Sequence, residues 1–413
     1  MEKKVSIAII GGGPAGLAAA VSCYEHGVKD IVIIERDTRL GGILQQCIHN
    51  GFGLHTFQEE LTGPEYAERY MDKVEEYGIE TLLDTMVLEL GADRVIRAIN
   101  PRLGLVTIHA DAVILCTGCR ERTRANLKIP GNRGAGILSA GLAQRLTNIE
   151  GYMPGKEIVI LGSGDIGLIM ARRLKFEGAN IKCVVELMPY STGLQRNIRQ
   201  CLEDFDIPLL FEHTVVDITG AKRVEGVTIA QVDKNRKPIK ETERYIPCDT
   251  LLLSVGLIPE NEIALGAGVA INPLTNGPVV DGWRMTNVSG IFACGNTLHV
   301  HDLVDYVSEE AHLAAQGAVR YVGQQYGGQE VEVRPGGGIR YVVPNRLDPV
   351  IPIELYFRPD NVYHNGTLKL MAGDEVILEK KFIKLTPGEM DRVRVTEETL
   401  QKIDDRPLSL ACK

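Results

Sequence analysis

Two glycine-rich segments, about a third of the chain apart, have the residue types and spacing that bind a dinucleotide phosphate. The first is VSIAIIGGGPAGLAAA and the second is KEIVILGSGDIGLIMARRL. Their glycines are Gly11, Gly13, Gly16, Gly162, Gly164 and Gly167. Each segment follows a Val/Ile-rich run and opens a helical pattern of small residues, a context that a chance match lacks. Glycine permits the tight turn and the close approach of backbone to pyrophosphate, and the helix N-terminus offers N–H groups. Two copies predict two dinucleotides and electron transfer between them.

An acidic residue follows each glycine pattern, at the end of the next apolar strand. Glu35 lies 19 residues after Gly16, and Glu186 lies 19 residues after Gly167. An acid at this position accepts hydrogen bonds from ribose hydroxyls and repels the 2′-phosphate of NADP. Residues 187–190 contain no Arg or Lys that could bind such a phosphate. The second site is therefore predicted to bind NAD(H) rather than NADP(H).

Composition narrows the class of protein. The chain has 413 residues and a net charge of −9, with no Lys/Arg stripe, so it lacks the footprint of a nucleic-acid-binding protein. No stretch approaches the roughly 18 apolar residues of a spanning helix, and Gly11 interrupts the N-terminal apolar run too early for a secretory signal. Nine scattered cysteines favour a reducing cytoplasm.

Strands alternate with helices through most of the chain, which predicts an α/β fold with parallel sheets. The pattern of residues 1–122 restarts at 123 and returns to its first style at about 245. We therefore expect one nucleotide-binding domain over 1–122 and 245–327, with a second, 123–244, inserted in it. A Gly-rich junction precedes short β-branched runs, which predict a small antiparallel β-rich unit over 328–413 with a hairpin turning at Gly373 and Asp374.

Several motifs occur in a fixed order between residue 5 and about 325. They are GGGPAG, Glu35, LGG, CTG, IPG, GSGDIG, SVGLIPEN and IFACGN. With these motifs the chain resembles the flavin- and pyridine-nucleotide-dependent oxidoreductases of the thioredoxin reductase and glutathione reductase superfamily. The resemblance implies two Rossmann-like dinucleotide-binding domains, the second inserted in the first, which bind FAD and NAD(H).

The resemblance also implies which residues hold the cofactors. The FAD positions are Gly11, Gly13, Pro14, Ala15, Gly16, Glu35, Arg36, Gly42, Val87, Thr117, Gly118, Gly295 and Asn296. The NAD positions are Gly162, Gly164, Asp165, Ile166, Gly167, Glu186 and Gly256. Asp165 is expected to cap its helix, and the helix from about Asp305 to point its N-terminus at the flavin. The family normally has Gly-Asp where this chain has Gly295-Asn296; Asn can still accept from a ribityl hydroxyl but lacks the charge.

The redox disulfide of these reductases is missing from both of its usual places. After LGG the chain has Cys47 alone, and the inserted domain has Cys183 and Cys201, too far apart in sequence for Cys-x-x-Cys. Cys116 and Cys119 do spell that motif, but they flank residues that the flavin site needs. Disulfide reductase activity is therefore not expected.

Three side chains are candidates for chemistry beside the flavin: Cys47, His49 and His301. A His with a pKa near neutrality could stabilise reduced flavin or shuttle a proton, and Cys47 could be a nucleophile or charge-transfer partner. The alternatives are that the histidines cap a helix or bond backbone, and that Cys47 is a small buried residue. His299 and His301 supply only two ligands, so no metal is expected.

The β-rich C-terminal unit resembles that of flavoprotein subunits in multi-component dehydrogenases acting on opines, amino acids or glycerol 3-phosphate. The resemblance implies an NAD-linked flavin subunit that works with companion chains. Two alternatives remain open. One is a self-contained NADH oxidase or ferredoxin-type reductase, and the other is a non-catalytic assembly subunit that binds nucleotides structurally.

Overall fold

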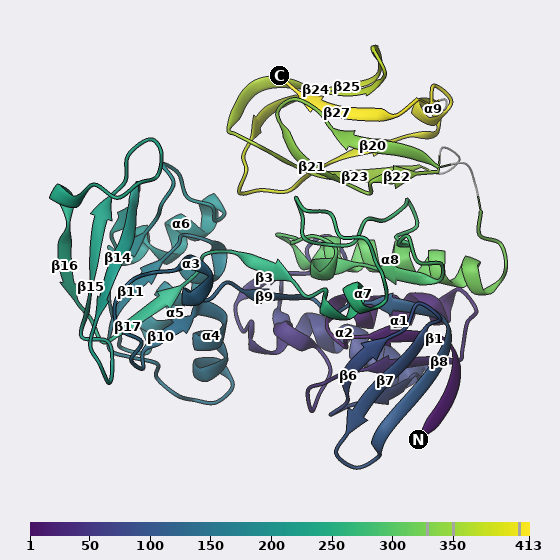
Figure 1. Cartoon of the computed structure of the whole chain (residues 1–413), viewed down its shortest axis with the longest axis horizontal. Helices are drawn as coiled ribbons and strands as arrows, with labels where there is room; N and C mark the ends of the chain where they lie inside the picture. Colours follow the sequence, from purple (N-terminus) through teal and green to yellow (C-terminus); the bar gives the residue numbers. More distant parts are fainter. Residues whose placement is uncertain (328–329, 349–351, 404–405) are drawn as a thin grey trace. The chain divides into compact units, whose positions relative to one another are not determined.

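The computed structural model describes residues 1–327, 330–348, 352–403 and 406–413. The chain forms two compact units (Figure 1). One comprises Met1–Cys119 and Pro259–Lys413, and the other comprises Arg120–Ile258. The chain passes between them in two short paired strands, β9 (Cys119–Glu121) and β18 (Leu257–Pro259). The α/β class with two dinucleotide-binding folds, predicted from the sequence, is confirmed.

A seven-stranded sheet is the framework of the first unit. Its order is β5-β2-β1-β8-β7-β6, and β19 pairs with the last three residues of β8, Val113–Leu115. Its strands are β1 (Glu2–Ile10), β2 (Ile31–Ile34), β5 (Glu80–Leu82), β6 (Met86–Leu90), β7 (Val95–Asn100), β8 (Gly104–Leu115) and β19 (Ile291–Ala293). Pairing is parallel through β5, β2, β1, β8 and β19, and antiparallel through β8, β7 and β6. The carboxyl ends of β1 and β8 therefore meet at one edge.

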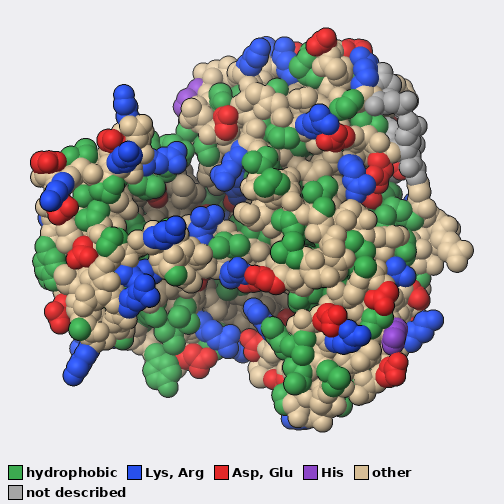
Figure 2. Space-filling model, in the orientation of Figure 1, with side chains coloured by type: hydrophobic (Ala, Val, Ile, Leu, Met, Phe, Trp, Pro, Cys, Tyr) green, Lys and Arg blue, Asp and Glu red, His purple; other side chains and the backbone are tan. Residues whose placement is uncertain are grey.

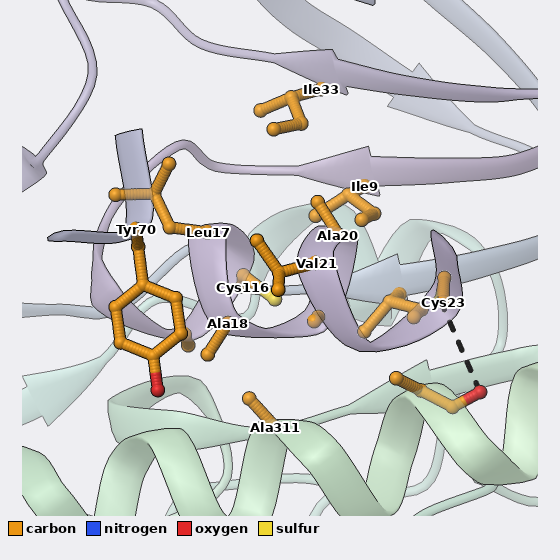
Figure 3. Packing of buried hydrophobic residues seen from close by; sticks show 14 of the residues in the cluster. Ile9, Leu17, Ala18, Ala20, Val21, Cys23, Ile33, Tyr70, Cys116 and Ala311 are labelled. Carbon is orange, nitrogen blue, oxygen red and sulfur yellow. Dashed lines mark hydrogen bonds between the residues drawn. The ribbon is translucent and has the colours of Figure 1, made fainter. Parts of the chain in front are cut away.

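Three helices cover this sheet: α1 (Pro14–Glu25), α2 (Gly63–Glu76) and α8 (Val304–Val322). Small residues let α1 and α8, which both contact the sheet, pack closely against each other, as Figure 3 shows for Ala18 on α1 and Ala311 on α8. α2 begins with a capping box in which Thr62 and Glu65 satisfy each other's backbone groups. The shorter elements of this part are η1 (Gly42–Gln46), β3 (Asn50–Phe52), β4 (Leu61–Thr62), α7 (Glu262–Gly266) and η4 (Gly295–Thr297).

The second unit has a parallel sheet of order β10-β17-β11-β12-β13 and an antiparallel sheet of order β14-β15-β16. Its strands are β10 (Ile137–Ser139), β11 (Glu157–Leu161), β12 (Asn180–Val185), β13 (Leu209–Leu210), β14 (His213–Thr219), β15 (Gly226–Gln231), β16 (Arg244–Pro247) and β17 (Thr250–Leu253). Its helices are α3 (Arg124–Leu127), α4 (Ala140–Asn148), α5 (Asp165–Phe176), α6 (Gln195–Cys201), η2 (Glu203–Phe205) and η3 (Lys240–Thr242).

The boundary expected at 245 differs from the observed one. The segment 245–258 contributes β17, which pairs with β11 and β10 in the second unit rather than joining the first. Its apolar sequence resembles the strands of both units, so composition alone could not assign it. Only the pairing partners decide where a buried parallel strand belongs.

The C-terminal residues form two small sheets that pack within the first unit. Their elements are β20 (Val331–Pro335), β21 (Ile339–Val343), β22 (Arg346–Leu347), β23 (Ile353–Pro359), β24 (Tyr363–Ala372), β25 (Glu375–Leu385), β26 (Asp391–Val395), α9 (Glu397–Leu400) and β27 (Leu408–Cys412). The hairpin predicted at Gly373 and Asp374 is confirmed, because Ala372 pairs with Glu375. One pair, β20 with β27, is parallel, which the expectation of an antiparallel unit did not include.

Charged side chains of both signs are mixed on the face of the C-terminal β unit that Figure 2 shows. Ion pairs in this unit include Arg406–Glu375 and Lys369–Glu379. Among the described residues, none of the helices combines the length and apolar character needed to cross a bilayer.

Candidate dinucleotide sites

The first glycine pattern forms the turn from β1 into α1. Gly11 has φ +107°, and a Cβ there would overlap the carbonyl of Cys116 at the end of β8. A Cβ on Gly16 would overlap the carbonyl of Gly11, so this glycine lets helix and strand approach closely. The N-cap residue of α1 is Gly13, and Pro14 follows it in the first turn. With no side chain at Gly13, the N-terminal N–H groups of α1 face the loop and suit a phosphate.

Glu35 fixes the shape of this loop. Its Oε2 accepts a hydrogen bond from the N–H of Gly12 (2.6 Å), and its Oε1 accepts one from the N–H of Asp37 (2.8 Å). The atom nearest to a Cβ built on Gly13 is the Cα of Gly42, at 3.9 Å. The two glycines thus let these backbone segments approach closely, because a Cβ on Gly42 would lie 2.9 Å from the Cα of Gly13. The sequence predicted Glu35 as a ribose contact, and the structure adds its bonds to the loop.

The end of β8 meets the segment after β19 through hydroxyl groups. The Oγ1 of Thr117 donates to the carbonyl of Glu260 (2.7 Å) and lies 2.8 Å from the Oγ1 of Thr297. The N–H of Gly118, which has φ +72°, donates to that same Oγ1 (2.7 Å). Thr297 therefore joins the two segments that the sequence assigned to the FAD pyrophosphate.

Gly295 and Asn296 follow β19 and are held from two directions. Gly295 has φ +72°, and its N–H donates to Glu310 Oε2 of α8 (2.9 Å). The Oδ1 of Asn296 accepts from the N–H of His301 (3.0 Å). The oxygen expected to accept from a ribityl hydroxyl is thus already an acceptor for the chain itself. The Nδ2 of the amide lies 3.5 Å from the Sγ of Cys119.

A buried charged cluster lies beneath these residues. Arg284 Nε donates to Glu310 Oε1 (3.0 Å), and both side chains are at most 1% exposed. His299 Nε2 lies 3.2 Å from Glu310 Oε1, and His301 Nε2 lies 3.5 Å from Glu310 Oε2. His299, His301 and Glu310 have potential metal-ligand atoms that all lie within 4.8 Å of one another. The Arg284 guanidinium already neutralises Glu310, however, so a metal cation here would meet a positive charge.

Burial and mutual contact shift the pKa values in this cluster. Burial by itself raises the pKa of Glu310, but His299, His301 and Arg284 outweigh it and hold that pKa well below its usual range. Burial, and then the neighbouring His299, lower the pKa of His301 to about 3. The ring of His301 also bonds backbone, through Nδ1 to the carbonyl of His299 (2.9 Å). His301 is therefore neutral at pH 7, which favours a packing role over proton donation.

The other two candidate catalytic side chains lie between η1 and β3. Cys47 donates through Sγ to the carbonyl of Ile43 (3.3 Å), and burial raises the pKa of its thiol to about 12. A thiol that is neutral at pH 7 is a poor nucleophile, so the structure favours the packing interpretation of Cys47. His49 is half-buried; its Nδ1 lies 3.1 Å from the carbonyl of Asn50, and its ring lies 5.1 Å from that of Phe52.

The second glycine pattern repeats the geometry of the first between β11 and α5. Gly162 has φ +97°, and a Cβ there would overlap the carbonyl of Ser254 at the end of β17. The N–H of Gly167 donates to Ser254 Oγ (3.1 Å). Gly164 is the N-cap residue of α5, and its conformation is extended. The loop is thus shaped as a phosphate-binding turn.

Glu186 holds this second loop as Glu35 holds the first. Its Oε2 accepts from the N–H (2.9 Å) and the Oγ (2.6 Å) of Ser163. Its Oε1 accepts from the N–H of Met188 (2.9 Å). The carboxylate is buried, at 5% exposure, and lies where the sequence predicted an acid at the end of β12.

Asp165 lies in the first turn of α5, directly after the N-cap residue Gly164. Its Oδ1 accepts from the N–H of Leu194 (2.8 Å) and from Nδ2 of Asn197 (2.7 Å). It therefore fixes the start of α6 against the glycine loop. Ile166 is half-buried against the core of this unit. Gly256, with φ +100°, accepts at its carbonyl from the N–H of Arg122 (3.0 Å).

The remaining predicted FAD positions lie around the same sheet. Arg36 is exposed directly after Glu35. Val87 is buried on β6 in the core beneath the antiparallel ribbon. Ala15, in the first turn of α1, would be 2.9 Å from a Cβ built on Gly295, which explains the glycine at that position. α8 begins at Val304, and the carboxylate of Asp305 accepts hydrogen bonds from the N–H groups of Gly53, His55 and Thr56.

Eight of the nine cysteines are buried, and Cys119 is partly exposed. All nine lie among the described residues, and none forms a disulfide. Cys116 faces Cys294, with 3.5 Å between the sulfurs, rather than its Cys-x-x-Cys neighbour Cys119. The pKa of Cys294 is raised well above its usual value, mainly by the hydrogen bond with Cys116 and also by burial. Burial also raises the pKa values of Cys183 and Cys201, each to about 11.

Sequence reasoning missed five residues that shape the two sites. They are Ser163, Ser254, Arg284, Thr297 and Glu310. Ser163, Ser254 and Thr297 lie inside or beside recognised motifs, so local position could have drawn attention to them. Arg284 and Glu310 belong to separate segments, and no spacing in the sequence connects them.

The donor groups fit two dinucleotides, because each loop presents N–H groups at a helix N-terminus and each has a buried acid where a ribose is expected. Comparison with known proteins agrees with two dinucleotide-binding sites. The family model described as pyridine nucleotide-disulphide oxidoreductase matches residues 5–318, which is more than half of the chain.

Individual relatives share this core at low identity. An opine oxidase subunit of Agrobacterium tumefaciens (strain Ach5) is 23% identical, over 81% of this chain and 70% of that protein. The small chain of glutamate synthase [NADPH] of Escherichia coli (strain K12) is 26% identical, over 76% of this chain and 68% of that protein. The crystal structure of T. acidophilum thioredoxin reductase has a TM-score of 0.63 at 23% identity, covering 78% of this chain and 99% of that one.

The match over residues 5–318 includes both glycine loops and the segments that close them. The chain belongs to the pyridine nucleotide-disulphide oxidoreductase family, whose members are flavoproteins that bind FAD and NAD(P).

Proposed function

We propose that this chain transfers hydride between NAD(H) and FAD as the electron-transfer subunit of a multi-subunit dehydrogenase. The observation that carries the proposal is the pair of glycine loops, each of which donates a backbone hydrogen bond to a buried glutamate, Glu35 or Glu186. None of the nine cysteines forms a disulfide in the structure. When bound, the two dinucleotides supply the redox chemistry, hydride transfer between nicotinamide and flavin. The residues of the chain bind and orient them.

The first loop would hold FAD. The N-terminal N–H groups of α1 would face its pyrophosphate, and Glu35 would meet the adenosine ribose. Thr117, Gly118 and Gly295 would lie along the pyrophosphate and ribityl chain. The hydroxyl of Thr297 fixes the first two of these positions, and Glu310 fixes the third.

The second loop would hold NAD(H) in preference to NADP(H). The buried carboxylate of Glu186 would accept from the adenosine ribose hydroxyls and repel a phosphate there. The next four residues, 187–190, contain no Arg or Lys. A buried carboxylate at this position favours the uncharged ribose of NAD(H) over a 2′-phosphate.

The chain would pass electrons without a dithiol. Burial raises the pKa of Cys47, and the Cys116 sulfur faces Cys294 instead of Cys119. Two relatives are named as parts of larger enzymes, an opine oxidase and a glutamate synthase. We therefore propose companion subunits and an organic substrate among opines, amino acids and glycerol 3-phosphate.

Purification from the native host, followed by mass analysis of the chains that co-purify, tests the complex. Stoichiometric companion chains, and faster NADH turnover in their presence, are expected. A homodimer or monomer that oxidises NADH rapidly with oxygen alone would contradict the proposal and favour the stand-alone oxidase. A bound flavin that resists every nicotinamide donor would favour the non-catalytic subunit.

A further inference from the structure

Hydrogen bonds from Arg358 and from the backbone of Met390 hold the segment between Asn296 and α8 against the C-terminal β unit. Arg358 lies on β23, and its Nη2 donates to the carbonyl of Val300 (3.2 Å) and to Asp302 Oδ1 (2.5 Å). The second oxygen of Asp302 accepts from the N–H of Met390, just before β26 (2.6 Å). Two different parts of the β unit therefore hold the same short segment.

The fastened segment also orients a residue of the proposed flavin site. His301 lies between Val300 and Asp302, and its N–H donates to Asn296 Oδ1 (3.0 Å). This hydrogen bond fixes the orientation of the Asn296 amide, whose Nδ2 then lies 3.5 Å from the Sγ of Cys119. A shift of residues 300–302 would move that N–H and release the amide.

The side chain of Arg358 is largely buried rather than exposed on the surface. Its side chain is 12% exposed, and all three of its nitrogens donate hydrogen bonds. Nε donates to the hydroxyl of Tyr341 (3.2 Å), and Nη1 donates to the carbonyl of Gly388 (2.6 Å). A planar guanidinium can bond in these several directions at once, whereas a lysine ammonium on its flexible stem cannot reproduce the fork.

We propose that Arg358 is a positioning residue of the flavin site: it acts through Asp302 and His301 to hold Asn296 in the orientation that binds FAD. The C-terminal β unit is then part of the cofactor site, although none of its residues needs to touch the cofactor. The inference rests on the proposed FAD site at Gly295 and Asn296.

The test measures FAD binding to apoprotein made from the full chain, with no nicotinamide present. Arg358→Met is expected to raise the dissociation constant for FAD at least 10-fold and to shift the visible spectrum of the bound flavin. Asp302→Asn, which weakens the same link with little change of shape, is expected to act in the same direction. Arg358→Lys should give an intermediate loss. Arg334→Met is the matched control, because Arg334 lies on β20 of the same β unit, 62% exposed, and pairs with Glu332 on the surface.

A double-mutant comparison separates positioning from simple loss of stability. If Arg358 acts through Asn296, Arg358→Met should weaken FAD binding much less in an Asn296→Ala background than in the wild-type chain. Equal fold-changes in the two backgrounds would overturn the inference, as would FAD binding by Asp302→Asn and Arg358→Met that matches the Arg334→Met control. If Arg358→Met does not fold, Asp302→Asn in both backgrounds decides. Failure of the wild-type chain to bind FAD would overturn the proposed function as well.

Discussion

The replacement Glu186→Gln tests how the second site chooses its nucleotide. The substitution keeps the size and planarity of the side chain but removes its charge. Glu186 accepts three hydrogen bonds from Ser163 and Met188, and the amide oxygen of Gln can keep only part of this set. The loop should stay folded while the negative potential at the ribose position disappears.

The expected size of the effect follows from the charge. Two unit charges about 5 Å apart interact by roughly 3 kcal/mol at an effective dielectric constant of about 20. Removing a repulsion of that size should change the preference for NADH over NADPH by roughly 100-fold. Affinity for NADH itself should fall by less, because a neutral amide still accepts a hydrogen bond from a ribose hydroxyl.

The assay compares dissociation constants for NADH and NADPH in the wild type, in Glu186→Gln and in Glu177→Gln. Glu177 pairs with Arg173 at the far end of α5, so its loss should leave the preference unchanged. A wild-type chain that binds NADPH as well as NADH would refute the reasoning. An unaltered preference in Glu186→Gln would refute it too.

Three further predictions follow from burial and charge. His301 has a folded-state pKa of about 3, below the unfolded value of about 6.5, so the unfolded state takes up the proton first as pH falls. This group should lower the free energy of unfolding by about 2 kcal/mol between pH 7 and pH 5, and denaturant titrations should show a smaller decrease in His301→Gln. Glu310→Gln leaves the Arg284 charge buried and unpaired and should cost about 3–5 kcal/mol of stability by the same method. Cys47→Ser should reduce flavin with NADH at the wild-type rate in stopped-flow measurements, because the thiol, with a pKa of about 12, is neutral at pH 7; a rate loss of 10-fold or more would restore Cys47 as a reacting group.

Local features of the two sites could be predicted from the sequence. Glu35 and Glu186 were found because each ends the strand after a glycine pattern, and neighbouring parallel strands bring that end beside the loop. The hairpin at Gly373 was found for a similar reason, since a two-residue turn determines its own strand pairing.

Features made by distant segments could not be predicted. Arg284 and Glu310 come from a loop and from α8, and their pairing depends on how α8 packs against the sheet. Arg358 reaches Asp302 from a unit whose sequence has no recognisable motif. The domain boundary predicted at 245 differs from the observed one, after Ile258, for a related reason. The apolar residues of β17 would suit either parallel sheet.

An anaerobic titration of the purified protein, together with its companion chains, tests hydride transfer most directly. NADH is added in steps while the visible absorbance of the bound flavin is recorded. We expect stoichiometric bleaching by NADH and much weaker bleaching by NADPH at the same concentrations. A flavin that dithionite reduces but NADH leaves oxidised would contradict the proposed transfer between the two dinucleotides.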